Sequence, residues 1–182
     1  MNPVSERYTH TAIAMHWLIA FLILATLPLG VYMSNLPLSP GKLKFYSCHK
    51  WIGITVLMLA VLRLLWRARH KPPSLLDPAP RWQRFTSHAV HLLLYFLLVA
   101  VPLSGWTMSP AKGFQTVWFG VLPLPDLVDK NKALGDLLTT LHQGLNLVLA
   151  ALIATHVAAA MKHHFIDRDA TLRRILPFGK GA

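Results

Sequence analysis

Histidine is the residue whose number and spacing point to chemistry in this chain of 182 residues, which contains ten of them. His142 and His156 lie in one long apolar run. Over their separation of about 14 residues a helix makes four turns less about 40° and rises about 21 Å. One helix therefore presents two imidazoles on the same face, and their separation covers most of a hydrocarbon core about 30 Å thick.

Each of these two histidines needs a partner at its own depth. His49, at the outer end of a second apolar run, matches His142, and His16, near the inner end of a first run, matches His156. Neutral imidazole is a good iron ligand, and two axial imidazoles leave iron no open coordination position. The pairs His16–His156 and His49–His142 therefore predict two bis-histidine haems, which transfer electrons and do not readily bind oxygen.

Other interpretations of the same residues stay open. A membrane histidine can serve as a packing hydrogen-bonding group, and the small residues Gly53 and Gly144 can serve helix packing as well as give a haem room. A zinc or copper site needs its ligands gathered at one depth, which the 21 Å rise opposes. Three methionines are possible axial ligands: Met15, Met58 and Met161. The single cysteine, Cys48, excludes a disulfide within the chain and any site built on several cysteines.

The elements that must position these histidines are four apolar runs. Of all residues 54% are apolar or aromatic and only 14% are charged, against about 25% in an average soluble domain. Each run approaches the roughly 20 residues that a membrane helix needs. We expect an all-α integral membrane four-helix bundle that binds two haems within the bundle. It forms one domain over 1–182, with spans at about 13–33, 48–68, 86–108 and 139–163.

The net charge of +11 is a topology signal in such a protein. Twelve Lys and Arg residues fall on the side of the N-terminus, the segment 63–84 and the tail from Lys162, and six fall on the other side. The positive-inside rule then places both termini in the cytoplasm of a bacterial cell, and the protein in the inner membrane. This interpretation is favoured over a nucleic-acid partner.

Four stretches of the sequence resemble the bacterial cytochrome b561 family of four-helix, dihaem, quinone-linked cytochromes. They are 8–17, 48–54, 88–95 and 156–174, so that the resemblance spans nearly the whole chain. It implies two haem b groups, with His16 and His156 at the cytoplasmic haem and His49 and His142 at the periplasmic haem. The spacing in the fourth helix is also similar to cytochrome b subunits of hydrogenases and formate dehydrogenases. A haem-bearing membrane-anchor subunit of a larger redox enzyme therefore stays open as the alternative.

The resemblance also implies a quinone site near the cytoplasmic haem, around His91 and His163. Each could donate a hydrogen bond to a quinone carbonyl or pass a proton, and ordinary solvation at the interface is the alternative. Some members of the family oxidise superoxide outside and reduce ubiquinone. The outer lysines could attract that anion, or they could be ordinary loop charges.

The predicted function is electron transfer across the membrane between the periplasmic face and a quinone, as a quinone-linked oxidoreductase of the superoxide:ubiquinone type. Its partners are the lipid bilayer, a quinone, superoxide and a redox partner protein, with no nucleic acid. No residue performs covalent catalysis, since the haem supplies the redox chemistry. A membrane transporter without redox chemistry is the remaining alternative, and a visible absorption spectrum distinguishes the two.

Overall fold

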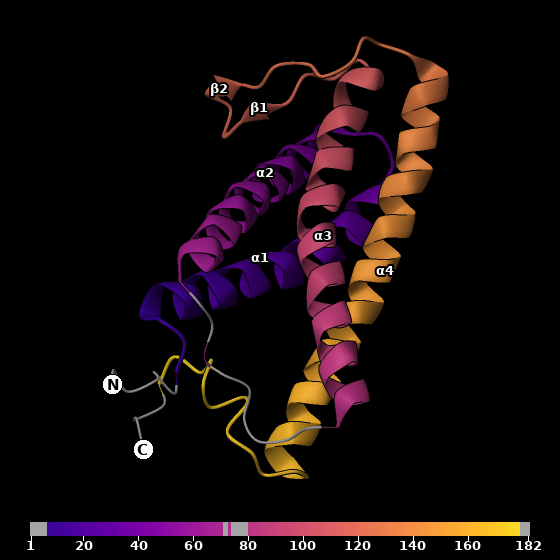
Figure 1. Ribbon diagram of the computed structural model, residues 1–182. Helices are drawn as coiled ribbons and strands as arrows, with labels where there is room; N and C mark the ends of the chain where they lie inside the picture. The colour runs from indigo at the N-terminus through magenta and orange to yellow at the C-terminus, as the bar shows by residue number, and fades with distance from the viewer. Residues whose placement is uncertain (1–6, 71–72, 74–79, 179–182) are drawn as a thin grey trace.

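The computed structural model describes residues 7–70, 73 and 80–178. Four long helices follow one another: α1 (His10–Ser34), α2 (Pro40–Arg69), α3 (Arg81–Ala111) and α4 (Lys132–Phe165) (Figure 1). Each extends beyond its predicted span at both ends, because an apolar run marks only the part in lipid while the helix continues to its cap. Lys71 and Lys180, which contribute to the basic count, lie outside the described residues.

Three of the four helices begin at a side chain that accepts a hydrogen bond from their first turn. Thr9 accepts from the Ala12 amide, Ser39 from the Lys42 amide and Asn131 from the Leu134 amide. These are favoured N-cap residues, because their oxygen atoms satisfy an amide that has no partner within the helix. Pro80 precedes α3 and caps it without a side-chain hydrogen bond. The start of each of these three helices is therefore determined by the local sequence.

All four helices are long and apolar enough to cross a membrane. Large apolar side chains point away from the bundle over its length: Phe21 is 68% exposed, Leu92 70% and Leu147 74%. Water would make such a surface costly, whereas lipid tails are as apolar as leucine. The predicted class, an all-α four-helix bundle of a membrane protein, is confirmed.

The helices pack in sequence order, α1 on α2, α2 on α3 and α3 on α4. α3 and α4 run side by side along most of their length (Figure 1). One buried cluster takes residues from all four helices: Ile19, Ile23, Val56, Ala60, Leu97, Leu98, Val101 and Leu149. Leu149 lies midway in the sequence between His142 and His156. This apolar layer therefore separates the depths of the two histidines on α4.

A short hairpin, absent from the sequence-based expectation, covers the outer end of α2. It consists of β1 (Val117–Trp118) and β2 (Leu122–Pro123), paired antiparallel. The Trp51 indole donates to the Val117 carbonyl at 2.7 Å, and the Trp118 indole reaches the Trp51 carbonyl and the Thr55 hydroxyl, each at 3.3 Å. The Trp118 side chain is therefore turned onto α2.

The two terminal segments meet at the opposite end of the bundle. The Tyr8 amide donates to the Arg174 carbonyl at 3.4 Å, and the Arg7 guanidinium donates to the Leu176 carbonyl at 2.6 Å. The indole of Trp17 donates to the Ile175 carbonyl at 2.8 Å. These contacts bring residues 7–17 and 174–176 together at one end of the bundle.

Candidate functional site

His49 and His142 face each other near the end of the bundle that carries the hairpin. Their ring centres are 6.3 Å apart and the ring planes are nearly perpendicular, at 83°. His49 comes from α2 and His142 from α4, and both are half-buried. The predicted outer pair is therefore brought together by the fold, on two helices that do not adjoin in the packing order.

Both outer imidazoles are oriented through the same nitrogen. The Nδ1 atom of His142 donates to the Val101 carbonyl at 3.1 Å and lies 2.9 Å from the Ser104 hydroxyl. The Nδ1 atom of His49 lies 3.1 Å from the Thr26 hydroxyl. A hydrogen bond at Nδ1 fixes the tautomer and turns the Nε2 lone pair toward a metal, as in most histidine ligands of metals.

Two glycines allow this close approach. A Cβ atom at Gly105 would lie 3.0 Å from Cε1 of His142, and one at Gly30 would lie 3.1 Å from Cε1 of His49. Both distances are shorter than ordinary contacts of a side chain. By contrast, a Cβ at Gly53 or Gly144 would meet no described atom within 4 Å. The first two glycines fit the imidazoles, and the other two border open space.

His16 and His156 form the second pair, at the end where the terminal segments meet. Their ring centres are 6.4 Å apart, with planes at 74°. His91 of α3 comes closer to His156, at 5.3 Å. The charge of Arg63 acts on both His16 and His156. The predicted inner pair is therefore also brought together, next to a third histidine and a cation.

The spacing of both pairs fits one metal between two imidazoles. A transition-metal–imidazole bond of about 2.0–2.1 Å, plus about 1.1 Å from nitrogen to ring centre on each side, gives about 6.3 Å between the two ring centres. The observed 6.3 and 6.4 Å match this value. The 5.3 Å between His91 and His156 is too short for a metal held in line between the two rings.

Space is also available between the helices that carry the pairs. Packing joins α1 to α2, α2 to α3 and α3 to α4, whereas the histidine pairs join α2 to α4 and α1 to α4. A small pocket, partly open to the outside, reaches His49 and His142 and is lined by residues of all four helices. The residues present therefore fit a flat group held between two imidazoles.

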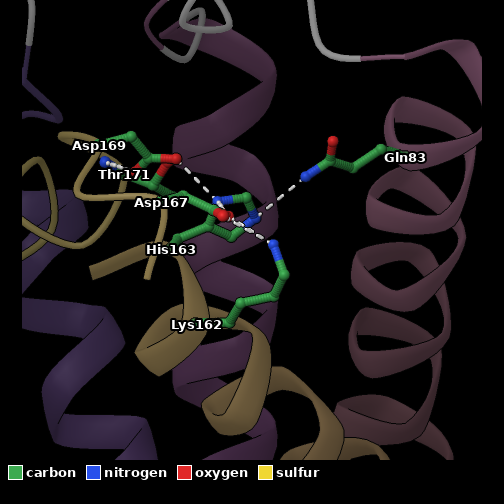
Figure 2. Close-up of polar contacts among 6 residues, drawn as sticks. All are labelled: Gln83, Lys162, His163, Asp167, Asp169 and Thr171. Carbon is green, nitrogen blue, oxygen red and sulfur yellow. Dashed lines mark hydrogen bonds and ion pairs between the residues drawn. The ribbon is translucent and has the colours of Figure 1, made fainter. Parts of the chain in front are cut away.

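The two histidines predicted to contact a quinone both lie where α3 meets α4, at the inner end. The Nδ1 atom of His91 donates to the Ser87 carbonyl at 2.8 Å, and the ring is exposed. The Nδ1 atom of His163 donates to Asp169 at 2.7 Å, and its Nε2 atom faces the Gln83 amide at 3.5 Å (Figure 2). Each ring therefore keeps Nε2 as the atom that can exchange a proton.

Asp169 fixes the orientation of the His163 ring by accepting a hydrogen bond from its Nδ1 atom. Partial burial opposes ionisation of the carboxyl, but hydrogen bonds from Thr171 and from His163 hold the pKa of Asp169 below its usual value. The carboxylate therefore stays charged at neutral pH and accepts from Nδ1. The structure gathers His163, Asp167 and Asp169 at the end of α4, where Gln83 of α3 faces them.

Three basic residues of α2 have defined contacts. Arg63 and Arg67 lie over the Tyr95 ring, at 5.8 and 5.5 Å, and Arg63 also donates to the Tyr95 hydroxyl. At the outer end the Lys50 ammonium donates to the Ser109 hydroxyl at 2.7 Å. Met58 and Met161 are exposed, which opposes a role as axial ligands.

Sequence reasoning missed the groups that hold the imidazoles in place. Thr26, Ser104, Gly30 and Gly105 touch or face the outer histidines, yet each is an ordinary residue for a membrane helix. One signal was present: Ser104 and Gly105 adjoin in a helix whose remaining span is almost entirely apolar. Such a polar residue followed by a small one, at the same depth as His142, is the pattern that could have indicated contact with that histidine.

The four helices are long enough to cross a membrane, and they hold two facing pairs of histidines. These features are typical of a multi-pass membrane protein of the cytochrome b class. Residues 7–178 match the family described as prokaryotic cytochrome b561, and the chain belongs to this family. It is 37% identical to cytochrome b561 homolog 2 of Escherichia coli K12, over 94% of this chain and 92% of that protein. It is 30% identical to cytochrome b561 homolog 1 of the same strain, over 94% and 98%.

A further relative is the protein named probable superoxide oxidase CybB of Yersinia pestis, which is 28% identical over 97% of this chain and 99% of its own length. Each relative is matched over nearly its full length, so the whole bundle is shared. Membership of the family implies b-type haem binding and electron transfer in a multi-pass inner-membrane protein.

Filling the contact between a glycine and its histidine should displace the outer imidazole. We expect Gly105→Ala to weaken retention of haem at the outer site by about tenfold or more, because overpacking costs about 1–3 kcal/mol. The haem-to-protein ratio after dilution or dialysis measures this. Gly41→Ala is the matched control, since its new Cβ meets its nearest atom at 3.8 Å. Equal haem retention in both variants would contradict the packing role of Gly105.

Proposed function

We propose that this protein transfers electrons across the inner membrane through two haem b groups, between the periplasmic face and a quinone at the cytoplasmic face. The observation that carries the proposal is the equal spacing of the two histidine pairs, 6.3 and 6.4 Å between ring centres. Haem iron, when bound, supplies one-electron transfer. His49 and His142 would hold the outer haem, and His16 and His156 the inner one.

The remaining residues prepare the two sites differently. Thr26, Ser104 and the Val101 carbonyl orient the outer imidazoles. At the inner site Arg63 and Arg67 would supply positive charge against the propionates of a bound haem. The apolar layer around Leu149 separates the two depths. Such a division suits a chain that moves electrons and admits no ions.

The proposed orientation puts both termini in the cytoplasm. The contacts between residues 7–17 and 174–176 support a common side for the two ends. The excess of twelve over six basic residues favours the cytoplasmic side. The histidines near the terminal segments, His16, His156, His91 and His163, then belong to the cytoplasmic half, and the hairpin belongs to the periplasmic face.

The quinone would bind near His91 and His163. His156 and His163 are separated by about two helical turns and so lie on one face of α4, about 10 Å apart along its axis. His91 lies against His156 from α3. Reduction of a quinone to a quinol takes two electrons and two protons, and the Nε2 atoms of His91 and His163 are the groups available to pass those protons.

Superoxide is the proposed electron donor at the outer face. One relative carries the name probable superoxide oxidase. The outer segments contain six lysines against Asp126, Asp129 and Asp136, a balance of +3. Lys112 and Lys132 are ion-paired with Asp136. Lys50 follows His49 in the sequence; its ammonium donates to the Ser109 hydroxyl and is acted on by the charge of Asp126. Because of its position next to His49, Lys50 is the lysine proposed to attract the anion, which gives up one electron and leaves as dioxygen.

Removal of one axial ligand from each pair tests the number of haems. The intact protein should hold two haems with low-spin bis-histidine spectra. His142→Ala should lose the outer haem and His156→Ala the inner one, so that the haem-to-protein ratio falls by about half in each. His88→Ala, an exposed histidine of α3, is the control. A single haem at full occupancy in the intact protein would show the two-site assignment to be wrong.

Replacement of His91 or His163 tests the quinone site. We expect His91→Ala and His163→Ala to slow quinone reduction by about tenfold or more, since general acid–base groups contribute at least that much. The haem spectrum should stay nearly intact, and His88→Ala should react at the normal rate. Loss of the inner-haem spectrum in His91→Ala would instead make His91 an axial ligand in place of His16.

The superoxide assignment is tested by the rate of haem reduction as salt and lysine charge are varied. A positive field can raise the rate of encounter with an anion by about tenfold or more at low salt. We expect reduction by superoxide to slow as salt rises and to be slower in Lys50→Met, whereas Lys132→Met serves as a control because Asp136 already pairs with it. Absence of reduction by superoxide, with normal reduction by a quinol, would leave a general electron carrier or an anchor subunit.

A further inference from the structure

Three metal-ligating side chains converge just beyond the end of α4, outside both histidine pairs. The backbone turns back at Arg168, whose φ of 54° is left-handed. Asp167 lies four residues after His163 and contacts it directly, and the turn brings Asp169 back to the same ring (Figure 2). The Nδ1 atom of His163 lies 2.7 Å from an oxygen of Asp169 and 3.2 Å from an oxygen of Asp167. The three ligand atoms all lie within 4.8 Å of one another.

These distances are close to those of a tetrahedral metal site. Bonds of about 2.0–2.1 Å to nitrogen and oxygen place neighbouring ligands about 3.3–3.4 Å apart around a tetrahedral ion. The contact between His163 and Asp167 already has nearly this length, and the one between His163 and Asp169 must open by about 0.6 Å. One imidazole with two carboxylates suits Zn²⁺, whereas Mg²⁺ and Ca²⁺ prefer oxygen ligands alone and more of them.

The cluster already holds a cation of the chain itself. The Lys162 ammonium lies 2.8 and 2.6 Å from the two oxygens of Asp167 (Figure 2). Two carboxylates, one lysine and a neutral histidine leave the four residues with a net charge of −1. A divalent ion therefore has an electrostatic reason to enter, and Lys162 is the group it must displace.

We propose that His163, Asp167 and Asp169 bind one divalent transition-metal ion of the Zn²⁺ type at the cytoplasmic end of α4. The ion is held by Nδ1 of His163 and one oxygen of each carboxylate, and water completes the tetrahedron. Lys162 moves into solvent. The proposal does not depend on the function proposed above, although the two share His163.

Two consequences follow for the surrounding chain. The metal ties residues 167–169 to α4 and so reinforces a tail that already contacts α1 through Trp17. Metal on Nδ1 also leaves the proton of His163 on Nε2. That atom then changes from an acceptor to a donor, and Gln83 must present its carbonyl oxygen in place of its amide.

Direct measurement of Zn²⁺ binding to the purified, haem-loaded protein tests the site. The protein is stripped with a chelator, and Zn²⁺ is titrated against a fluorescent competitor, with bound metal counted by elemental analysis. We expect one Zn²⁺ per chain at this site, and binding weakened by about tenfold or more in Asp167→Asn and in Asp169→Asn. Two controls should bind as the parent does: His164→Gln at the neighbouring position and Asp136→Asn at the opposite end.

A variant that binds Zn²⁺ more tightly than the parent distinguishes loss of the metal site from loss of folding. Lys162→Met removes the competing cation and should tighten Zn²⁺ binding by up to about fivefold. An unaltered haem spectrum in each variant shows that the bundle is intact. The proposal is overturned if the two carboxylate variants bind Zn²⁺ as the parent does, if the controls lose as much affinity as they do, or if Lys162→Met fails to tighten binding.

Discussion

A polar imidazole at membrane depth must find a partner, because lipid offers no hydrogen bonds and no ligands. Four histidines of the bundle, from three helices, meet this constraint by facing each other in two pairs. The ring centres of the pairs are 6.3 and 6.4 Å apart. These distances are too long for direct hydrogen bonds between the rings and suit a bridging metal. The packing order of the helices agrees with this spacing, since α4 packs mainly on α3 and not on α1 or α2, the helices that carry the facing histidines.

The two levels differ in how the protein treats its imidazoles. The outer rings are fixed by a backbone carbonyl and two hydroxyls, and two glycines remove the side chains that would push them aside. The inner rings have a cation and a third histidine nearby. Hydrogen bonds at Nδ1 raise the basicity of a ligand, whereas a nearby positive charge favours the reduced state of a cofactor. In the proposed assignment these effects act in the same direction and favour electrons on the inner side.

Much of this arrangement could be predicted from the sequence, because it depends on helical periodicity and on depth. The spacing of His142 and His156 places both on one face of α4, and the position of His16 and His49 in their own runs gives the pairing. Other features depend on tertiary contacts that no local pattern records. The hairpin at Val117–Pro123 is short and is held by indoles of α2 and its own strand, and the return of Asp169 to His163 depends on a left-handed residue at Arg168.

α4 contributes one histidine to each pair, and it follows α1, α2 and α3 along the chain, so it is synthesised after them. In the proposed assignment neither haem site is complete while only α1, α2 and α3 have entered the membrane. The first three helices can insert and pack in order, but α1 and α2 each offer one ligand and α3 offers none. Cofactor capture is therefore a late event of biogenesis, and a chain truncated before Lys132 would be a membrane protein without a closed pair.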